Sequence, residues 1–161
     1  MLQDDGKAKD CATGAKKDAL KQGETTMALI IWNDTLSVKV AELDGQHRKL
    51  IAMINDLTDA IPKGKGKAVM GQTVQGLIDY AKIHFRTEEK YFAQLGYPQA
   101  ARHIQEHEAF TQKVSGFEAG TANGRMRSSV ELLQFLGDWL IQHILKTDQE
   151  YVDFFKAKGL Q

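Results

Sequence analysis

The sequence has a single cysteine, Cys11, which excludes an internal disulfide framework and is typical of a reducing compartment such as the cytoplasm. Neither sign of charge is in excess: Lys and Arg number 21, as do Asp and Glu, so the basic footprint of a nucleic-acid-binding protein is missing. No apolar run approaches the roughly 18 residues of a transmembrane helix, and the opening MLQDDGKAKD lacks the apolar core of a secretory signal. We therefore expect a cytoplasmic protein with no nucleic-acid partner and no membrane segment in this chain.

Large apolar groups are also scarce in the first part of the chain. Residues 1–28 are rich in Lys, Asp, Gly, Ala and Thr and cannot bury much surface, so we expect a flexible leader or the stub of an upstream region there. The remainder, 29–161, suits one domain with a sizeable core, since the whole chain is 42% apolar and 26% charged.

Apolar residues recur at helical spacing in four segments, and no useful strand-like alternation follows residue 40. After an extended arm that begins at IIWNDTLSV, we predict helices at about 44–61, 68–95, 98–119 and 126–156. PKGKGK (62–67), GYP (96–98) and GTANG (120–124) separate them, and Pro98 suits the first turn of the third helix. Short connections between four helices predict an all-α, antiparallel up-down-up-down four-helix bundle with an extended N-terminal arm.

Histidine has an unusual distribution. All five histidines fall on or beside the apolar side of a predicted helix: His47, His84, His103, His107 and His143. His84 and Glu88 are one helical turn apart, as are His103 and His107, so each pair projects from one face. A single histidine in such a place is more often a core residue bonded to a backbone carbonyl. Five buried imidazoles need partners that a metal supplies together, so the pattern predicts a metal site inside the bundle.

The donor types leave the choice of metal open. Imidazole and carboxylate suit iron, zinc, copper or nickel, and five imidazoles exceed what one tetrahedral zinc uses. Two ions bridged by carboxylates would use every donor, with Glu88 and Asp148 as the candidates. Asp148 follows His143 at a spacing that places it about 140° around an ideal helix, so spacing alone does not distinguish it from a solvent-facing aspartate.

A series of short motifs carries a family resemblance. In chain order they are Trp32-Asn33, D-x-Q-H (44–47), H-F-x-x-E (84–88), Y-P-x-x-x-x-H-x-x-x-H (97–107) and W-L-x-x-H-I-x-x-x-D (139–148). Their order and separations make residues 29–156 resemble the hemerythrin family, and in particular its bacterial members. Every metal-ligand position of the family pattern is filled in this chain.

The resemblance implies a non-haem di-iron site that binds O2 reversibly, with two Fe ions joined by a bridging oxo or hydroxo group. The family pattern gives one iron three histidines and the other iron two, and both irons share two carboxylates. The resemblance assigns His103, His107 and His143 to the first iron and His47 and His84 to the second. It assigns Glu88 and Asp148 as the shared carboxylates. The iron with two histidines would keep one position open for dioxygen.

Other residues receive weaker expectations. Leu140, Ile144 and Trp139 flank His143 and are expected to line the dioxygen pocket, although they equally suit plain bundle core. Glu89 is predicted to face solvent. Trp32 and Tyr97 are expected to pack the arm and the second interhelical turn against the bundle.

Four functions remain in order of preference. The first is an oxygen carrier, store or delivery protein. The second is the oxygen- or redox-sensing module of a signalling protein, with an upstream signalling domain as a possible neighbour of residues 1–28. The third is a di-iron peroxidase or nitric-oxide scavenger, and the fourth is a bundle without metal.

Overall fold

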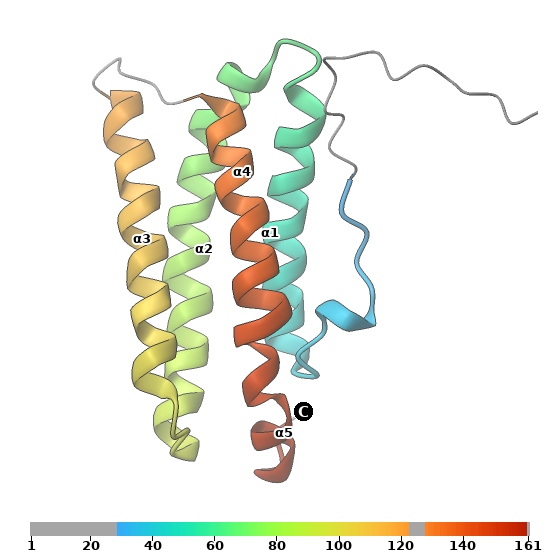
Figure 1. The fold of residues 1–161 in the computed structure, drawn as a ribbon, viewed down its shortest axis with the longest axis vertical. Helices are drawn as coiled ribbons and strands as arrows, with labels where there is room; N and C mark the ends of the chain where they lie inside the picture. Colours follow the sequence, from blue (N-terminus) through green and yellow to red (C-terminus); the bar gives the residue numbers. More distant parts are fainter. Residues whose placement is uncertain (1–28, 123–127, 161) are drawn as a thin grey trace, which may run out of the picture.

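The computed structural model describes residues 29–122 and 128–160. Four long helical columns lie side by side, and the arm before α1 runs along the outside of the bundle (Figure 1). The elements are η1 Asp34–Leu36, α1 Ala41–Ala60, α2 Gly66–Leu95, α3 Ala100–Ala122, α4 Ser129–Trp139, η2 Leu140–Thr147 and α5 Gln149–Ala157. The described residues contain no strand, so the predicted all-α four-helix bundle is confirmed. The expectation for residues 1–28 falls outside the described part of the chain.

The arm is tied to the start of α1 by Asp44. The two oxygens of this buried carboxylate accept hydrogen bonds from the Ser37 hydroxyl at 2.6 Å and from the Val38 N–H at 2.8 Å. Trp32 packs against the core, and the Arg48 guanidinium carbon lies over it, 4.3 Å from the centroid of the Trp32 ring. Because the arm is held at both points, the start of α1 has a fixed position relative to the bundle.

Gly96 ends α2 in a left-handed conformation, with φ of 71°, which glycine adopts without steric penalty. The N–H groups of Gly96 and Tyr97 both bond to the Phe92 carbonyl, at 2.9 and 3.0 Å. Tyr97 is buried at this turn, as expected. Pro98 precedes α3, which begins at Ala100, so the prediction that Pro98 occupies the first helical turn was wrong.

One further boundary differs from the predictions, and another falls outside the described residues. The α3 helix continues to Ala122, so the loop predicted at 120–124 begins later, because helical hydrogen bonding continues through its first residues. The predicted start of the last helix at Met126 lies outside the described residues. Ser128 caps α4 by accepting the Glu131 N–H at 3.0 Å.

The predicted single last helix is interrupted. Residues Leu140–Thr147 form a π-helix between α4 and α5, in which the N–H of Asp148 bonds to the carbonyl of His143 at 2.9 Å. A π-helix bonds residue i to i+5 and inserts one residue relative to an α-helix. This extra residue changes the direction of the Asp148 side chain.

The core consists of two apolar clusters. The larger includes Leu50, Phe85 and Ile144, and the smaller includes Leu43, Phe92, Tyr151 and Phe155. On α1, α2 and the last column, buried polar residues stand between members of the two clusters: His47, Glu88 and Asp148. The bundle therefore has a polar layer between two apolar layers. None of the helices over 29–122 and 128–160 has the length and apolar character needed to cross a membrane.

Candidate metal centre

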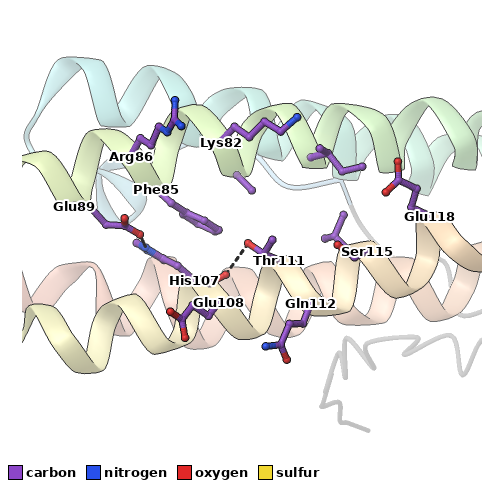
Figure 2. A pocket seen from close by; sticks show the side chains of 13 residues that line it. Lys82, Phe85, Arg86, Glu89, His107, Glu108, Thr111, Gln112, Ser115 and Glu118 are labelled. Atoms are coloured by element: carbon purple, nitrogen blue, oxygen red, sulfur yellow. Dashed lines mark hydrogen bonds and ion pairs between the residues drawn. The ribbon is translucent and has the colours of Figure 1, made fainter.

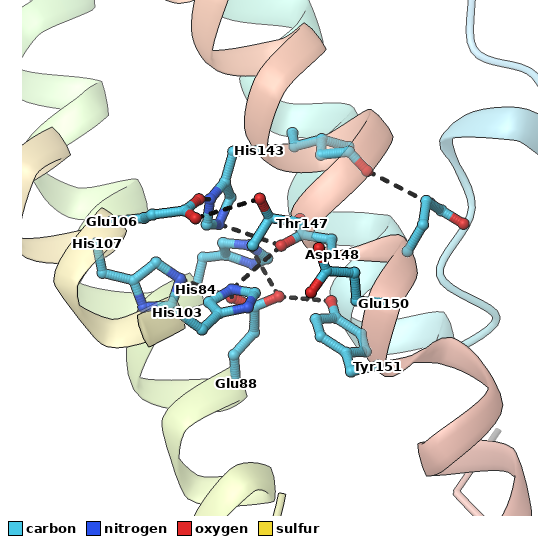
Figure 3. Close-up of polar contacts among 12 residues, drawn as sticks. His84, Glu88, His103, Glu106, His107, His143, Thr147, Asp148, Glu150 and Tyr151 are labelled. Atoms are coloured by element: carbon cyan, nitrogen blue, oxygen red, sulfur yellow. Dashed lines mark hydrogen bonds and ion pairs between the residues drawn. The ribbon is translucent and has the colours of Figure 1, made fainter. Parts of the chain in front are cut away.

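The polar layer brings together all the residues that the sequence singled out as metal ligands. The α1 helix contributes His47, and α2 contributes His84 and Glu88. The α3 helix contributes His103 and His107, the π-helix contributes His143, and Asp148 follows at the C-terminal end of the π-helix. Each is at most 2% exposed, so these side chains have no contact with bulk solvent. Figure 3 shows the labelled members converging between the helices.

Their donor atoms form two groups that share one carboxylate. Within each group the atoms lie no more than 4.8 Å apart. The first group is Glu88, His103, His107 and His143, and the second is His47, His84, Glu88 and Asp148. Three histidines therefore serve one group and two serve the other, which matches the division that the family pattern implies.

The oxygens of Glu88 are divided between the two groups. Its Oε2 lies 3.0 Å from Nε2 of His107 and 3.4 Å from Nε2 of His103. Its Oε1 faces the other way, 3.6 Å from Nε2 of His84, and accepts a hydrogen bond from the Tyr151 hydroxyl at 2.5 Å. The Tyr151 bond fixes the orientation of the carboxylate that both groups share.

Asp148 is divided in the same manner. Its Oδ1 lies 3.1 Å from Nε2 of His143 and 3.2 Å from Nε2 of His103, while Oδ2 lies 3.2 Å from Nε2 of His47. On a regular α-helix this side chain would point well away from His143. The π-helix between the two residues turns Asp148 back toward the centre, which resolves the ambiguity left by the sequence.

Several of the buried nitrogen and oxygen atoms that could bind a metal have no hydrogen-bond partner. Their environment shows whether these residues fit a metal. Atoms without a hydrogen-bond partner include Oε2 of Glu88, both carboxylate oxygens of Asp148, and Nε2 of His103, His107 and His143. Native proteins pair nearly all buried polar atoms. The Nε2 atoms of His47 and His84 also face each other at 3.2 Å. Since unpaired nitrogen and oxygen atoms converge at one place, the arrangement fits a pair of metal ions.

A second set of polar residues orients the imidazoles through Nδ1, a role that the sequence patterns did not indicate. Nδ1 of His84 lies 2.8 Å from the Gln46 amide oxygen, and Nδ1 of His143 lies 2.7 Å from the Glu106 carboxylate. Such partners fix the ring and its tautomer in metal sites. Gln46 and Glu106 each precede a histidine in the chain but contact a histidine on a different helix. Gln46 already stood in the D-x-Q-H motif, whereas the only signal for Glu106 was its place beside a candidate ligand.

The environment of Glu89 differs from the one predicted. It was expected to face solvent, but its carboxylate accepts the Nδ1–H of His107 at 3.0 Å, with the side chain 36% exposed. Figure 2 shows this contact at the edge of a groove of about 500 Å³ between α2 and α3, whose lining includes Phe85 and Lys82. The helix turns far enough between Glu88 and Glu89 for adjacent carboxylates to contact opposite sides of the same imidazole.

The pKa values of the clustered histidines differ from one another. Burial lowers the pKa of His84 to about 3, so this imidazole is neutral, as a metal ligand must be. Burial also lowers the pKa of His103, but its contacts to Asp148 and Glu88 outweigh that effect and raise the pKa to about 9. Burial by itself raises the pKa of Glu88, yet the adjacent histidines, His84 first, hold it well below its usual range. At neutral pH His84 is therefore neutral and His103 protonated, and metal binding would displace the proton on His103.

The residues expected to line a ligand pocket lie directly above His143 in the larger apolar cluster. Trp139 stacks on the His143 ring with 4.0 Å between centroids, and Leu140 and Ile144 are buried. In the same cluster, Phe85 stacks on His107 with 3.9 Å between ring centroids. Apolar and aromatic groups thus cover one side of the centre.

A four-helix bundle with two buried groups of histidines and carboxylates defines a class of protein, the helical bundles built around a di-metal centre. The family model described as the Hemerythrin HHE cation binding domain matches residues 38–155. The chain therefore belongs to the hemerythrin family, and its buried cluster is consistent with the di-iron site of that family.

Curated relatives and a solved structure agree with this assignment. The chain is 36% identical to a bacteriohemerythrin of Stenotrophomonas maltophilia, over 81% of this chain and 84% of the relative. It is 36% identical to a bacteriohemerythrin of Pseudomonas aeruginosa, over 79% of this chain and 82% of the relative. A crystal structure of wild-type hemerythrin superposes with a TM-score of 0.70 at 29% identity, covering 78% of this chain and 97% of that one.

Proposed function

We propose that the centre holds two iron ions and binds dioxygen reversibly. The observation that carries this proposal is the division of each carboxylate, Glu88 and Asp148, between a group with three histidines and a group with two. With both carboxylates shared, His103, His107 and His143 would hold one iron, and His47 and His84 the other. The iron pair would supply electrons to dioxygen and, on the two-histidine side, an open position for it.

The protein's own residues support this chemistry by holding charge and excluding water. The two carboxylates offset part of the metal charge, and the imidazoles donate lone pairs, in an interior where bulk solvent does not reach. Tyr151 holds the Glu88 oxygen on the two-histidine side, and Gln46 holds His84. The larger apolar cluster, which includes Trp139, Leu140 and Ile144, restricts access of water and reductants. Such an arrangement favours binding and release over turnover.

The absorption spectrum of the iron-loaded protein tests this function. The reduced protein is expected to be nearly colourless, to gain ligand-to-iron charge-transfer bands on exposure to air, and to lose them again under vacuum. Reversal under vacuum separates reversible binding from the enzymatic alternatives, in which a reductant drives steady turnover. A spectrum that develops in air and never reverses would contradict reversible binding, and protein without iron after expression in iron-rich medium would contradict the centre itself.

Truncation of Leu140 is predicted to shorten the life of the oxygenated form while iron is retained. Leu140 is 6% exposed and lies one turn before His143, so Leu140→Ala opens space above the centre to solvent. The measurement is the decay rate of the charge-transfer bands in air. Leu136→Ala is the matched control, because it leaves a similar cavity one turn earlier in the chain, farther from His143. It is expected to lower the free energy of unfolding by about 2–5 kcal/mol without changing the decay rate of the bands. Equal decay rates in the two variants would refute the pocket role.

Removal of the Glu106 carboxylate is predicted to weaken iron retention. Glu106 accepts the Nδ1–H of His143, and loss of such a partner weakens metal binding by about 10- to 100-fold. Competition against a coloured iron chelator measures the effect in Glu106→Ala. Glu108→Ala, an exposed carboxylate on the same helix, controls for the change in charge and is expected to match the unaltered protein. Identical retention in both variants would show that Glu106 does not support His143.

A further inference from the structure

Tyr80 carries a buried hydroxyl that no group in the described part of the protein accepts. The residue is 7% exposed, and its hydroxyl oxygen is buried without a hydrogen-bond partner. Its ring stacks on His84, with 4.8 Å between centroids and 19° between planes. Buried hydroxyl groups are normally paired, so an unpaired one beside a metal ligand requires an explanation.

The position of Tyr80 places it on the apolar side of the centre. It lies one helical turn before His84 on α2, and Leu140 lies one turn before His143 in the last column. Because α2 and α4 run in the same direction in the bundle, these two residues lie on the same side of the polar layer (Figure 1). Both belong to the larger apolar cluster. Tyr80 is therefore a polar group in the apolar region next to the two-histidine side.

The neighbours of Tyr80 leave its proton available. Phe85 and Phe110 present ring edges or faces at centroid distances of 6.1 and 6.4 Å, and neither accepts a conventional hydrogen bond. A tyrosine hydroxyl can donate one hydrogen bond, and no residue in the described part of the protein accepts one from Tyr80.

A second buried tyrosine beside the centre, Tyr151, differs from Tyr80 in that its hydroxyl is hydrogen-bonded. Tyr151 donates to Oε1 of Glu88 at 2.5 Å, so its hydroxyl is used within the protein. Tyr80 stacks on His84 and also lines a groove of about 260 Å³ between α1 and α2, together with Gln46 and Met53 among others. One tyrosine thus supports a ligand residue, and the other contacts a ligand residue of the two-histidine side with an unused donor.

We propose that the Tyr80 hydroxyl donates a hydrogen bond to the small ligand that enters the centre on the His47–His84 side, either dioxygen or a small anion. This inference rests on the proposed function, because it requires metal on that side. A donor in an otherwise apolar region stabilises a ligand that gains negative charge on binding, and a hydrogen bond to a charged acceptor is among the stronger ones. Tyr80 thereby determines how tightly the centre holds its ligand.

Azide is the probe for the test, used with the oxidised, iron-loaded protein. Tyr80→Phe keeps the ring that stacks on His84 and removes only the hydroxyl. The azide dissociation constant is expected to rise by about 10- to 100-fold, the range for a lost hydrogen bond to a charged acceptor, with iron content unchanged. Tyr97→Phe is the matched control, because its hydroxyl bonds to Gln99 at 3.1 Å near the far end of α2. That variant is expected to bind azide as the unaltered protein does.

The outcomes separate this inference from the proposed function. Equal azide affinity in Tyr80→Phe and the unaltered protein, both with full iron, overturns the role of Tyr80 and leaves the iron site in place. Loss of iron in Tyr80→Phe also overturns it, because the hydroxyl would then support the metal rather than the ligand. Failure of the unaltered protein to bind iron or azide refutes the proposed function itself.

A second measurement needs no variant. The azide stretching frequency of the unaltered protein is expected to shift between H2O and D2O, because exchange replaces the donated proton by a deuteron. An unshifted frequency would overturn the hydrogen bond even if Tyr80→Phe failed to fold.

Discussion

Replacement of Glu88 by alanine is expected to empty the centre of iron. Glu88 is fully buried and is the one residue that belongs to both groups of donor atoms. Its loss removes a ligand from each proposed iron and leaves the Tyr151 hydroxyl without its acceptor. Because loss of an outer partner alone weakens metal binding by about 10- to 100-fold, removal of a shared ligand is expected to exceed that range. Iron per chain, measured by elemental analysis after gel filtration, is expected to fall from two to near zero.

The control for this variant lies on the same helix. Asp79→Ala also removes a carboxylate from α2, but Asp79 is exposed and lines only the surface groove. It is expected to keep full iron, which would exclude a general effect of charge on iron loading. His84→Ala provides an independent check, because it removes a ligand from the two-histidine side alone. Two irons per chain in both Glu88→Ala and His84→Ala would exclude the ligand assignment.

Exchange of Thr147 and Asp148 is expected to abolish the centre without a change in composition or net charge. The double variant Thr147→Asp, Asp148→Thr places the carboxylate four residues after His143, where a regular α-helix would bring it under the imidazole. In this protein the π-helix directs position 147 elsewhere: the Thr147 hydroxyl donates to the Gln142 carbonyl at 3.1 Å and to Glu106 at 3.3 Å. A carboxylate there would face Glu106, so iron per chain is expected to fall to one or less.

Thr147→Val is the control for the loss of the Thr147 hydrogen bonds. It keeps Asp148 in place, with its two oxygens near His143 and His47, and is expected to retain both irons. Elemental analysis and the charge-transfer spectrum would be recorded for both variants. Full iron in the exchanged variant would mean that the local helix had returned to α geometry, and the π-helix would then have no part in directing the ligand.

The helices and most of the candidate site follow from patterns with a fixed period. His84 with Glu88, and His103 with His107, are spaced by one α-helical turn, so their shared direction could be inferred without coordinates. The burial of His47 and His143 likewise follows from the apolar residues around them at helical spacing. Sequence was sufficient for these residues because each statement concerns one regular helix and its apolar side.

Features that depend on an irregular helix could not be predicted in this way. The position of Asp148 was ambiguous because its direction depends on the hydrogen bond between its N–H and the His143 carbonyl, which breaks the α-helical period. Nothing in the residues between these positions marks a π-helix. The same limit explains why one continuous helix was expected where α4, η2 and α5 follow one another.

By itself, the sequence predicted the fold class, the resemblance to the family and the candidate metal ligands other than Asp148, because periodicity and motif spacing are properties of a single chain segment. Only the tertiary structure decided which polar groups on one helix contact which imidazoles on another. Gln46 reaches His84 and Glu106 reaches His143 across the bundle, and the partly exposed Glu89 contacts His107. These pairings depend on the rotation and axial offset of packed helices. Those quantities are set by how the apolar clusters interlock, and no local spacing in the sequence specifies them.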